Sequence, residues 1–283
     1  MSAIARRFLT VLEPLVSSIY FAPEATQEYQ QIGLDPVSGY FVSRSAALGR
    51  VSPDAVAALF YSFNPVLLRG VTWGVADPQD VLDARSRAVR RAFARLLDDA
   101  DIDEGRLVEA GELLREAAAG CRPEGRALFA AHAALQWPED PRSVVWHGAN
   151  LLREYRGDGH IAVLLSHGMR AVDAVAIHAA IRPQGRDFLL NSRMWGEDAY
   201  AQARARLATR GFLDQAGEVT DGGRKFREMI EVETDRLASA PFEALGVSLS
   251  ERLLGILEPL AAHVLKLGGI SDATVATGVG PTS

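Results

Sequence analysis

The segment between Arg186 and Gly246 constrains the fold of this 283-residue chain more than any other part of it. It predicts a short helix that ends at Trp195-Gly196 and a second helix that stops at Arg210-Gly211, where the glycine can adopt the left-handed conformation that closes a helix. Thr220 can then cap a long amphipathic helix. Two short strand couplets, joined by turn residues, lie between these helices: Phe212-Leu213 and Glu218-Val219. This order of elements is that of a winged helix-turn-helix.

The string RGFLDQAGEVTDGGRKF, residues 210–226, resembles the wing of MarR-type winged helices. In that family a recognition helix ends in glycine, and a strand leads through a β-turn into a new helix. Further strings resemble a set of actinobacterial helix-turn-helix proteins over residues 13–246: YFAPEA, GYFVSRSAALG, FYSFNP, WHGANLLREYRGDGH and TDRLASAP. The resemblance implies a helix-turn-helix fold and no established chemistry.

The whole pattern predicts a mainly α protein with two domains and a tail. Long runs of Ala, Leu and Arg favour helices, and a 48% hydrophobic content is ample for a packed core. Pro138 and Pro141 bracket a linker, so we expect a helical N-terminal domain at 1–138. A winged helix-turn-helix domain with a short β-wing and a C-terminal helix is expected at 139–270, followed by a disordered tail at 271–283.

Composition excludes several classes of protein. The single cysteine, Cys121, excludes an internal disulfide and a cysteine-based zinc cluster, which fits a reducing cytoplasm. No stretch approaches the ~18 uninterrupted apolar residues that a membrane span needs, and Glu13 and Pro14 interrupt the first apolar run, so we predict neither a membrane partner nor a signal peptide. The chain also lacks a GxSxG elbow, a GxGxxG loop after a strand and a Walker loop, so whether it is an enzyme stays open.

The charge pattern argues against DNA as a partner. The net charge is −6, and between Gly196 and Arg227 five acidic residues oppose six basic ones, whereas phosphate binding usually needs a basic face. Glu197 and Asp198 begin the second helix, and the wing tip is acidic where MarR-type regulators generally carry arginine. We therefore expect DNA binding to be lost. The alternative is a ligand-responsive regulator that contacts DNA through three arginines: Arg204, Arg206 and Arg210.

A small-molecule site is predicted where polar residues interrupt apolar or aromatic segments. Helical spacing places His147, Asn150 and Glu154 on one face, and Asp158, between two glycines, is expected to cap a new helix with His160 in its first turn. The predicted ligand-binding residues come from both halves of the chain: Tyr40, Arg44, Asn64, His147, Arg156, Asp158 and His160. His147 and His160 are the candidates for acid–base catalysis, because an imidazole titrates near neutral pH. The alternative is purely structural, with Asp158 as a cap and Arg156 paired to Glu154 or Asp158.

Two further hypotheses concern metals and assembly. His147, His160, His167 and His178 invite a haem or metal protein, but no HExxH or HxH spacing occurs, so we predict no metal site and no cofactor. The apolar stripe from Leu253 to Val264 suits packing in a homodimer, which we predict, or packing onto the N-terminal half. The sequence thus favours a cytoplasmic small-molecule-binding protein on a MarR-like scaffold, with or without catalytic activity.

Overall fold

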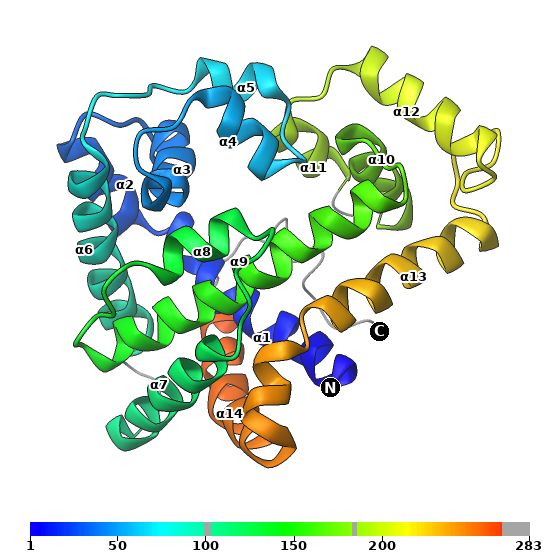
Figure 1. Cartoon of the computed structure of the whole chain (residues 1–283). Helices are drawn as coiled ribbons and strands as arrows, with labels where there is room; N and C mark the ends of the chain where they lie inside the picture. The colour runs from blue at the N-terminus through cyan, green and yellow to red at the C-terminus, as the bar shows by residue number, and fades with distance from the viewer. Residues whose placement is uncertain (99–102, 183–185, 268–283) are drawn as a thin grey trace.

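The computed structural model describes residues 1–98, 103–182 and 186–267, so the predicted tail at 271–283 lies outside the described residues. Within them the chain is mainly helical (Figure 1). The elements are, in chain order, α1 (Ser2–Tyr20), α2 (Pro23–Gln31), α3 (Pro36–Ser45), the 3-10 turn η1 (Ala46–Leu48), α4 (Pro53–Phe60), α5 (Pro65–Gly70), α6 (Pro78–Leu96), α7 (Glu104–Ala119), α8 (Ala127–Ala133), α9 (Pro141–Ser166), α10 (Ala171–Ile181), α11 (Arg186–Arg193), α12 (Glu197–Thr209), α13 (Asp221–Leu237) and α14 (Ala240–Lys266).

Local start signals explain where most of the N-terminal helices begin. Proline is the first residue of α2 to α6 and of α9, where its fixed φ suits a helix and its missing N–H costs nothing. The preceding residue often caps the helix with a side-chain oxygen: Ser52 accepts a hydrogen bond from the backbone of Ala55, and Asn64 accepts one from Val66. The predicted starts at Ser52-Pro53 and Asn64-Pro65 are confirmed.

Helix α9 is the central element and runs diagonally through the molecule (Figure 1). It contacts α1, α6, α7, α8 and α13. The predicted helix break at Gly157-Asp158-Gly159 is wrong, because α9 is continuous from Pro141 to Ser166. Gly159 serves close packing instead, because a Cβ there would lie 2.6 Å from the Arg126 guanidinium. Asp158 and His160 are therefore interior helix residues, and neither belongs to a new first turn.

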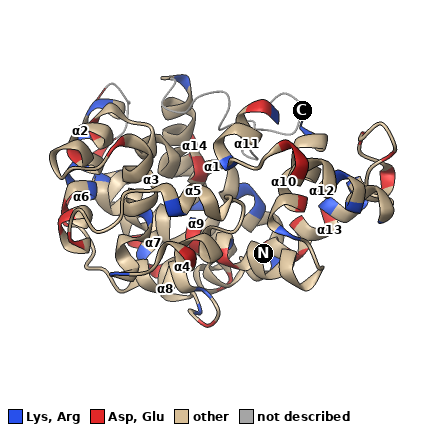
Figure 2. Ribbon diagram, turned by 90° about the horizontal axis from the view of Figure 1, so that it is seen from above, with Lys and Arg blue, Asp and Glu red and all other residues tan. Residues whose placement is uncertain are grey.

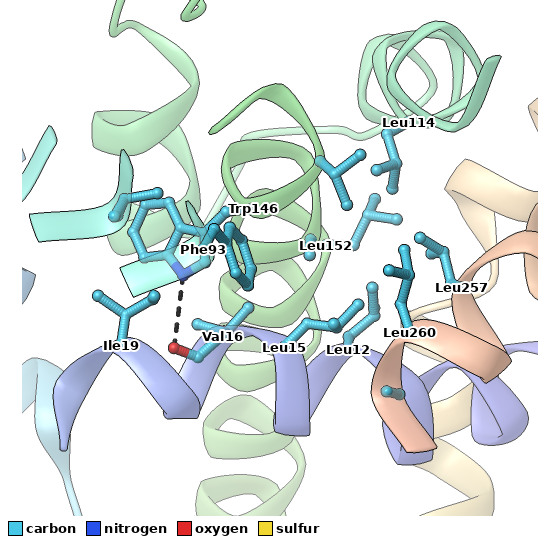
Figure 3. Packing of buried hydrophobic residues seen from close by; sticks show 14 of the residues in the cluster. Leu12, Leu15, Val16, Ile19, Phe93, Leu114, Trp146, Leu152, Leu257 and Leu260 are labelled. Atoms are coloured by element: carbon cyan, nitrogen blue, oxygen red, sulfur yellow. Dashed lines mark hydrogen bonds between the residues drawn. The ribbon is translucent and has the colours of Figure 1, made fainter. Parts of the chain in front are cut away.

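The largest hydrophobic core surrounds the first half of α9. Leu152 packs between α1 and α14, and the Trp146 indole donates a hydrogen bond to the Val16 carbonyl at 3.4 Å (Figure 3). Each fully buried Leu or Phe in such a core stabilises the fold by about 1.5–3 kcal/mol. This cluster contains residues from both sides of the predicted domain boundary at Pro138, and that boundary stays a prediction.

Helix α14 closes this core from the C-terminal end. The terminal helix predicted from Ser250 is the second part of α14, which bends at Gly246, where φ is 80°. The apolar stripe from Leu253 to Val264 is buried within the chain, and α14 packs against α1 and α7. Of the two packing partners that the sequence left open, the N-terminal half is the one observed. The homodimer stays a prediction and cannot use this face.

The hinge between α9 and α10 follows the predicted break near Gly168. Helix α9 ends at Ser166, and Gly168 takes a φ of 65° before α10 begins. No single helix among the described residues is long and apolar enough to cross a membrane. Helices α9 and α10 meet the length and composition criteria only as a pair, which is bent by 102°.

Helices α10 to α13 form the helix-turn-helix segment at the right of Figure 1. Helices α10, α12 and α13 share a hydrophobic cluster with the end of α9, in which Leu207, Phe226 and Ile230 are buried. Gly211 follows α12 with a φ of 74°, and the Thr220 hydroxyl accepts a hydrogen bond from the Gly223 backbone at 3.0 Å. Both local predictions, the glycine stop and the threonine cap, are confirmed.

The predicted β-wing is wrong. Among the described residues the only pairing in this loop is an isolated bridge between Leu213 and Val219, and no strand forms. Backbone hydrogen bonds still fasten the loop, from Asp214 to Glu218 at 2.9 Å and from Thr220 to Phe212 at 3.1 Å. The couplets are two residues long, and the chain enters α13 directly after Thr220, so no residues remain to extend a ladder.

Candidate functional site

A group of buried charges lies where α1, α3, α6, α9 and α11 meet. We call it the central cluster, and it consists of Glu13, Tyr20, Tyr40, Arg44, Arg85, Asn150, Arg153, Glu154 and Arg193. Its midpoint is Glu154, which accepts hydrogen bonds from Arg44 at 3.2 Å and from Arg153 at 2.9 Å. Arg153 also donates to Glu13 of α1 at 2.7 Å. Burial acts to raise the pKa of Glu154, but the two arginine charges outweigh it and lower the pKa to about 2.

Tyrosines border the Arg44 side of the central cluster. The Tyr40 hydroxyl accepts a hydrogen bond from Arg44 at 2.8 Å, and the Tyr20 hydroxyl donates one to the Asn150 carbonyl oxygen at 3.4 Å. The Arg44 guanidinium also lies 4.4 Å from the ring centre of Phe60, a cation–π contact. Burial raises the pKa of Tyr20 to about 12, so its hydroxyl stays protonated near neutral pH.

Arg85 and Arg193 bring two further guanidinium groups to the central cluster. Arg85 is buried in α6 and donates to the Ser43 carbonyl at 2.9 Å. Arg193 reaches in from α11 and lies 4.1 Å from the ring centre of Phe63. Burial lowers the pKa of both. Sequence patterns missed Glu13, Arg85 and Arg193, although the position of Arg85 on the apolar face of α6, beside Ala84 and Ala88, was an available signal.

Several buried polar atoms here lack a hydrogen-bond partner. Three are N–H donors of the central cluster: Arg44 Nε, Asn150 Nδ2 and Arg193 Nε. The neighbouring His132 donates from Nε2 to the Arg44 carbonyl at 3.0 Å, while its Nδ1 is unpartnered. A buried polar group without a partner costs about 1–3 kcal/mol. Three unpartnered donors thus belong to the central cluster.

Arg156 and His160, two of the predicted ligand-binding residues, face α13. Arg156 donates to Asp235 at 2.6 Å and to Glu231 at 2.8 Å. The Nδ1 atom of His160 lies 2.9 Å from the Thr234 hydroxyl, and burial lowers the pKa of His160 to about 4. These contacts fasten α9 to the helix-turn-helix segment. The structural alternative had paired Arg156 with Glu154 or Asp158, and its acidic partners are instead on α13.

Asp158 and His147 lie on α9 beside α8 and its flanking loop. Asp158 accepts a hydrogen bond from the Phe129 backbone at 3.0 Å, so it caps α8 from another helix. Burial raises the pKa of Asp158 to about 6. His147 contacts the edge of Trp137 at 4.7 Å between ring centres, and burial together with the charges of Arg85 and Arg115 lowers its pKa to about 4.

The seven predicted ligand-binding residues thus divide among several places. Tyr40 and Arg44 meet, Arg156 and His160 share the α13 side, and Asn64 donates to the Met194 carbonyl at 2.8 Å near the end of α11. A cavity of about 210 Å³ between α3 and α6 is lined by none of the seven. A smaller one of about 20 Å³, enough for one water, is bordered by Arg156 together with Glu13 and Arg153 of the central cluster.

The two arginines of α12 and Arg210, its C-cap, all have partners within the chain. Arg204 donates to the Ala216 carbonyl at 2.6 Å, and Arg206 pairs with the buried carboxylate of Asp173 at 2.5 Å. Arg210 donates to the His167 carbonyl at 3.0 Å and lies over the ring of Phe212. The exposed residues of α12 before Arg210 carry no positive charge: Glu197, Asp198, Ala201, Gln202, Ala205 and Thr209. Figure 2 shows red and blue segments interleaved over α12 and α13.

Other reactive groups fit poorly with chemistry at neutral pH. Burial raises the pKa of Cys121 to about 12, which leaves the thiol protonated. Within the described residues no group of three or more His, Cys, Asp or Glu side chains is placed to hold a metal ion. His147 and His160, the candidates for catalysis, are held neutral by burial and retain the ability to accept a proton.

Comparison with known proteins gives a single family. The model of a helix-turn-helix family matches residues 5–271. The match therefore covers the central cluster as well as α10 to α13. No curated protein and no solved structure matches the chain.

Proposed function

We propose, on the premise that this chain belongs to a helix-turn-helix family, that it is a small-molecule-binding protein whose helix-turn-helix segment has lost DNA binding. The observation that carries the proposal is the internal use of every arginine of α12. Arg206 illustrates it: its guanidinium pairs with the Asp173 carboxylate, whose side chain is 5% exposed. A guanidinium held in that way is not available to a phosphate or a base edge.

The outward surface of the segment supports the same conclusion. Phosphate contacts supply most of the affinity of DNA-binding proteins, and they need basic or hydrogen-bonding groups on the docking face. Helix α12 offers Glu197 and Asp198 in its first turn, and the loop that replaces the wing carries exposed Asp214 and Glu218. These four carboxylates would repel the DNA backbone where a recognition helix and wing approach it.

The ligand-binding part of the proposal is supported by the central cluster. Ligand sites combine apolar walls with a few polar anchors, and they often contain groups with shifted pKa values. Here the pKa values of Glu154 and Tyr20 are displaced to about 2 and about 12. Catalysis, if present, would use His147 or His160 as a neutral base, and we propose no reaction.

A DNA-binding measurement on the full chain tests the proposal. We expect a duplex that carries the chain's own upstream region to bind no tighter than ~10⁻⁶ M at physiological salt, the range of non-specific contact. Ala205→Glu adds an acid to the exposed face of α12 and should leave the DNA affinity unchanged. The matched Ala262→Glu, on the exposed side of α14, should also leave it unchanged. Nanomolar binding that Ala205→Glu abolishes and Ala262→Glu preserves would contradict the proposal.

The second candidate is a ligand-responsive transcriptional regulator, which the family match favours. Such a protein would release or bind DNA when its ligand occupies the core, and the direct contacts between α9 and α13 offer a physical link. The DNA measurement above distinguishes the two candidates.

Three more properties belong to the proposal. The MarR-like scaffold is supported by the wing string at 210–226. A cytoplasmic location is supported by the lone Cys121 thiol, which suits a reducing compartment. A homodimer, if it forms, must use a surface other than the stripe of α14, and mass measurement in solution at micromolar concentration tests it.

A further inference from the structure

We propose that the central cluster binds a small organic carboxylate. This inference rests on the proposed ligand-binding function and names its ligand class. Four guanidinium groups, those of Arg44, Arg85, Arg153 and Arg193, face two carboxylates, those of Glu13 and Glu154. Two positive charges therefore remain in excess in a largely buried region. Buried charges are costly unless they are paired, so an anion is the complement that this site lacks.

The unpartnered atoms of the central cluster also favour a ligand that carries acceptor oxygens. Arg44 Nε, Arg193 Nε and Asn150 Nδ2 are all donors, and none of them can accept a hydrogen bond. A ligand that satisfies them must bring acceptor oxygens. Guanidinium groups bind carboxylates through two parallel N–H···O bonds, which matches an arginine that still has an unused donor.

Solvent reaches the edge of the central cluster, and aromatic rings line that edge. The side chains of Glu13 and Arg153 are 15% and 20% exposed, and Tyr40 is half-buried. Rings of Phe63 and Phe21 lie beside Tyr40, at 6.2 Å and 6.4 Å between ring centres. These rings suit the apolar body of an organic acid. The adjoining cavity of about 20 Å³ is no larger than one water needs, so entry of an organic acid requires the half-buried side chains at the edge to move aside.

Benzoate and its neutral analogue benzamide provide the test. The two molecules have nearly the same shape and differ in charge, and the full chain is titrated with each by calorimetry at constant ionic strength. We expect benzoate to bind and benzamide to bind at least tenfold more weakly. Equal affinity for the two would overturn the proposal, since the arginine excess would then be irrelevant. Binding of inorganic phosphate without benzoate would also overturn it, because the site would then take inorganic oxyanions.

Arg193→Gln locates the binding. It removes one positive charge and one unpartnered donor, and we expect the benzoate affinity to fall about tenfold or more. The matched control is Arg91→Gln, which removes a half-exposed arginine of α6 paired to Glu28 of α2, and it should leave benzoate binding unchanged. Arg193→Lys keeps the charge and should lose less affinity than Arg193→Gln. Equal affinities in Arg193→Gln and Arg91→Gln would place benzoate elsewhere and overturn the proposal.

The DNA measurement remains independent of this result. If the chain binds benzoate at Arg193 and also binds DNA tightly, the proposed carboxylate site stands and the proposed loss of DNA binding is wrong. If the chain binds neither benzoate nor DNA, only the proposed carboxylate site is wrong.

Discussion

The arginines of α12 and those of the central cluster differ in how they are compensated. Arg204 and Arg206 bind acceptors within the helix-turn-helix segment, and Arg210, at the C-cap of α12, donates to the His167 carbonyl at the end of α9. In the central cluster guanidinium groups outnumber carboxylates, and two of them retain an unpartnered Nε. The recognition helix thus has its arginines bonded within the chain, with Arg224 and Lys225 of α13 left exposed, and the central cluster has kept an excess of positive charge. In this protein the family fold indicates one region as the binding surface, and the excess of positive charge indicates another.

The largest expected effect comes from removing the carboxylate at the midpoint of the central cluster. Glu154→Gln leaves Arg44 and Arg153 without their shared anion, and removing one partner of a buried ion pair costs about 3–5 kcal/mol. Urea unfolding at pH 7 measures the loss. The matched control is Glu251→Gln, which breaks an exposed pair with Arg7 and should cost no more than about 1 kcal/mol. Similar costs for both variants would mean that the ion pairs of the central cluster contribute no more to stability than an exposed pair does.

The pH dependence of stability gives a second, smaller effect. Burial, with the charge of Arg85, lowers the pKa of His147 to about 4 from 6.5. The folded state therefore binds fewer protons than the unfolded chain between these pH values. The contribution of His147 to the free energy of unfolding is complete above pH 6.5 and is lost as the pH falls toward 4. Between pH 7 and pH 5 we expect this histidine to account for a loss of about 2 kcal/mol.

His147→Gln checks that assignment, because glutamine does not titrate. The difference in unfolding free energy between pH 7 and pH 5 should be smaller in the variant than in the unmodified chain. Asp158 has the opposite effect on the pH dependence of stability, because its pKa is raised to about 6 in the folded state. Its contribution to the free energy of unfolding is present at low pH and is lost as the pH rises through 6. An unchanged pH dependence in His147→Gln would show that the buried histidine is not held neutral.

The smallest expected effect concerns the helix-turn-helix segment. Arg204→Ala removes a single hydrogen bond to the Ala216 carbonyl, which contributes about 0.5–1.5 kcal/mol. Thermal unfolding should show a modest decrease in Tm, and DNA affinity should stay in the non-specific range. A variant with unchanged Tm and a measurable loss of DNA affinity would mean that Arg204 is directed at DNA, and the comparison between the two regions would fail.

Sequence reasoning succeeded where neighbouring residues decide the structure. The stop at Gly211, the cap at Thr220 and the proline starts at Pro53 and Pro65 were predicted because each depends on the φ preference or hydrogen bonding of one or two residues. It failed at Gly157-Asp158-Gly159, where two glycines suggested a break and the helix continues. The glycine at 159 is there for the approach of Arg126, which is distant in sequence.

The sequence by itself determined a mainly helical chain, the helix-turn-helix order and the near-neutral charge of its recognition helix. It also identified Tyr40 and Arg44 as polar groups set in an aromatic segment, and these two do meet. Only the tertiary structure decided that Glu13, Arg153, Glu154 and Arg193 surround them, and that the arginines of α12 bind acceptors within the chain. Ion pairing over such separations depends on how helices pack, because each helix specifies which of its faces is apolar and cannot specify the partner that the face will meet.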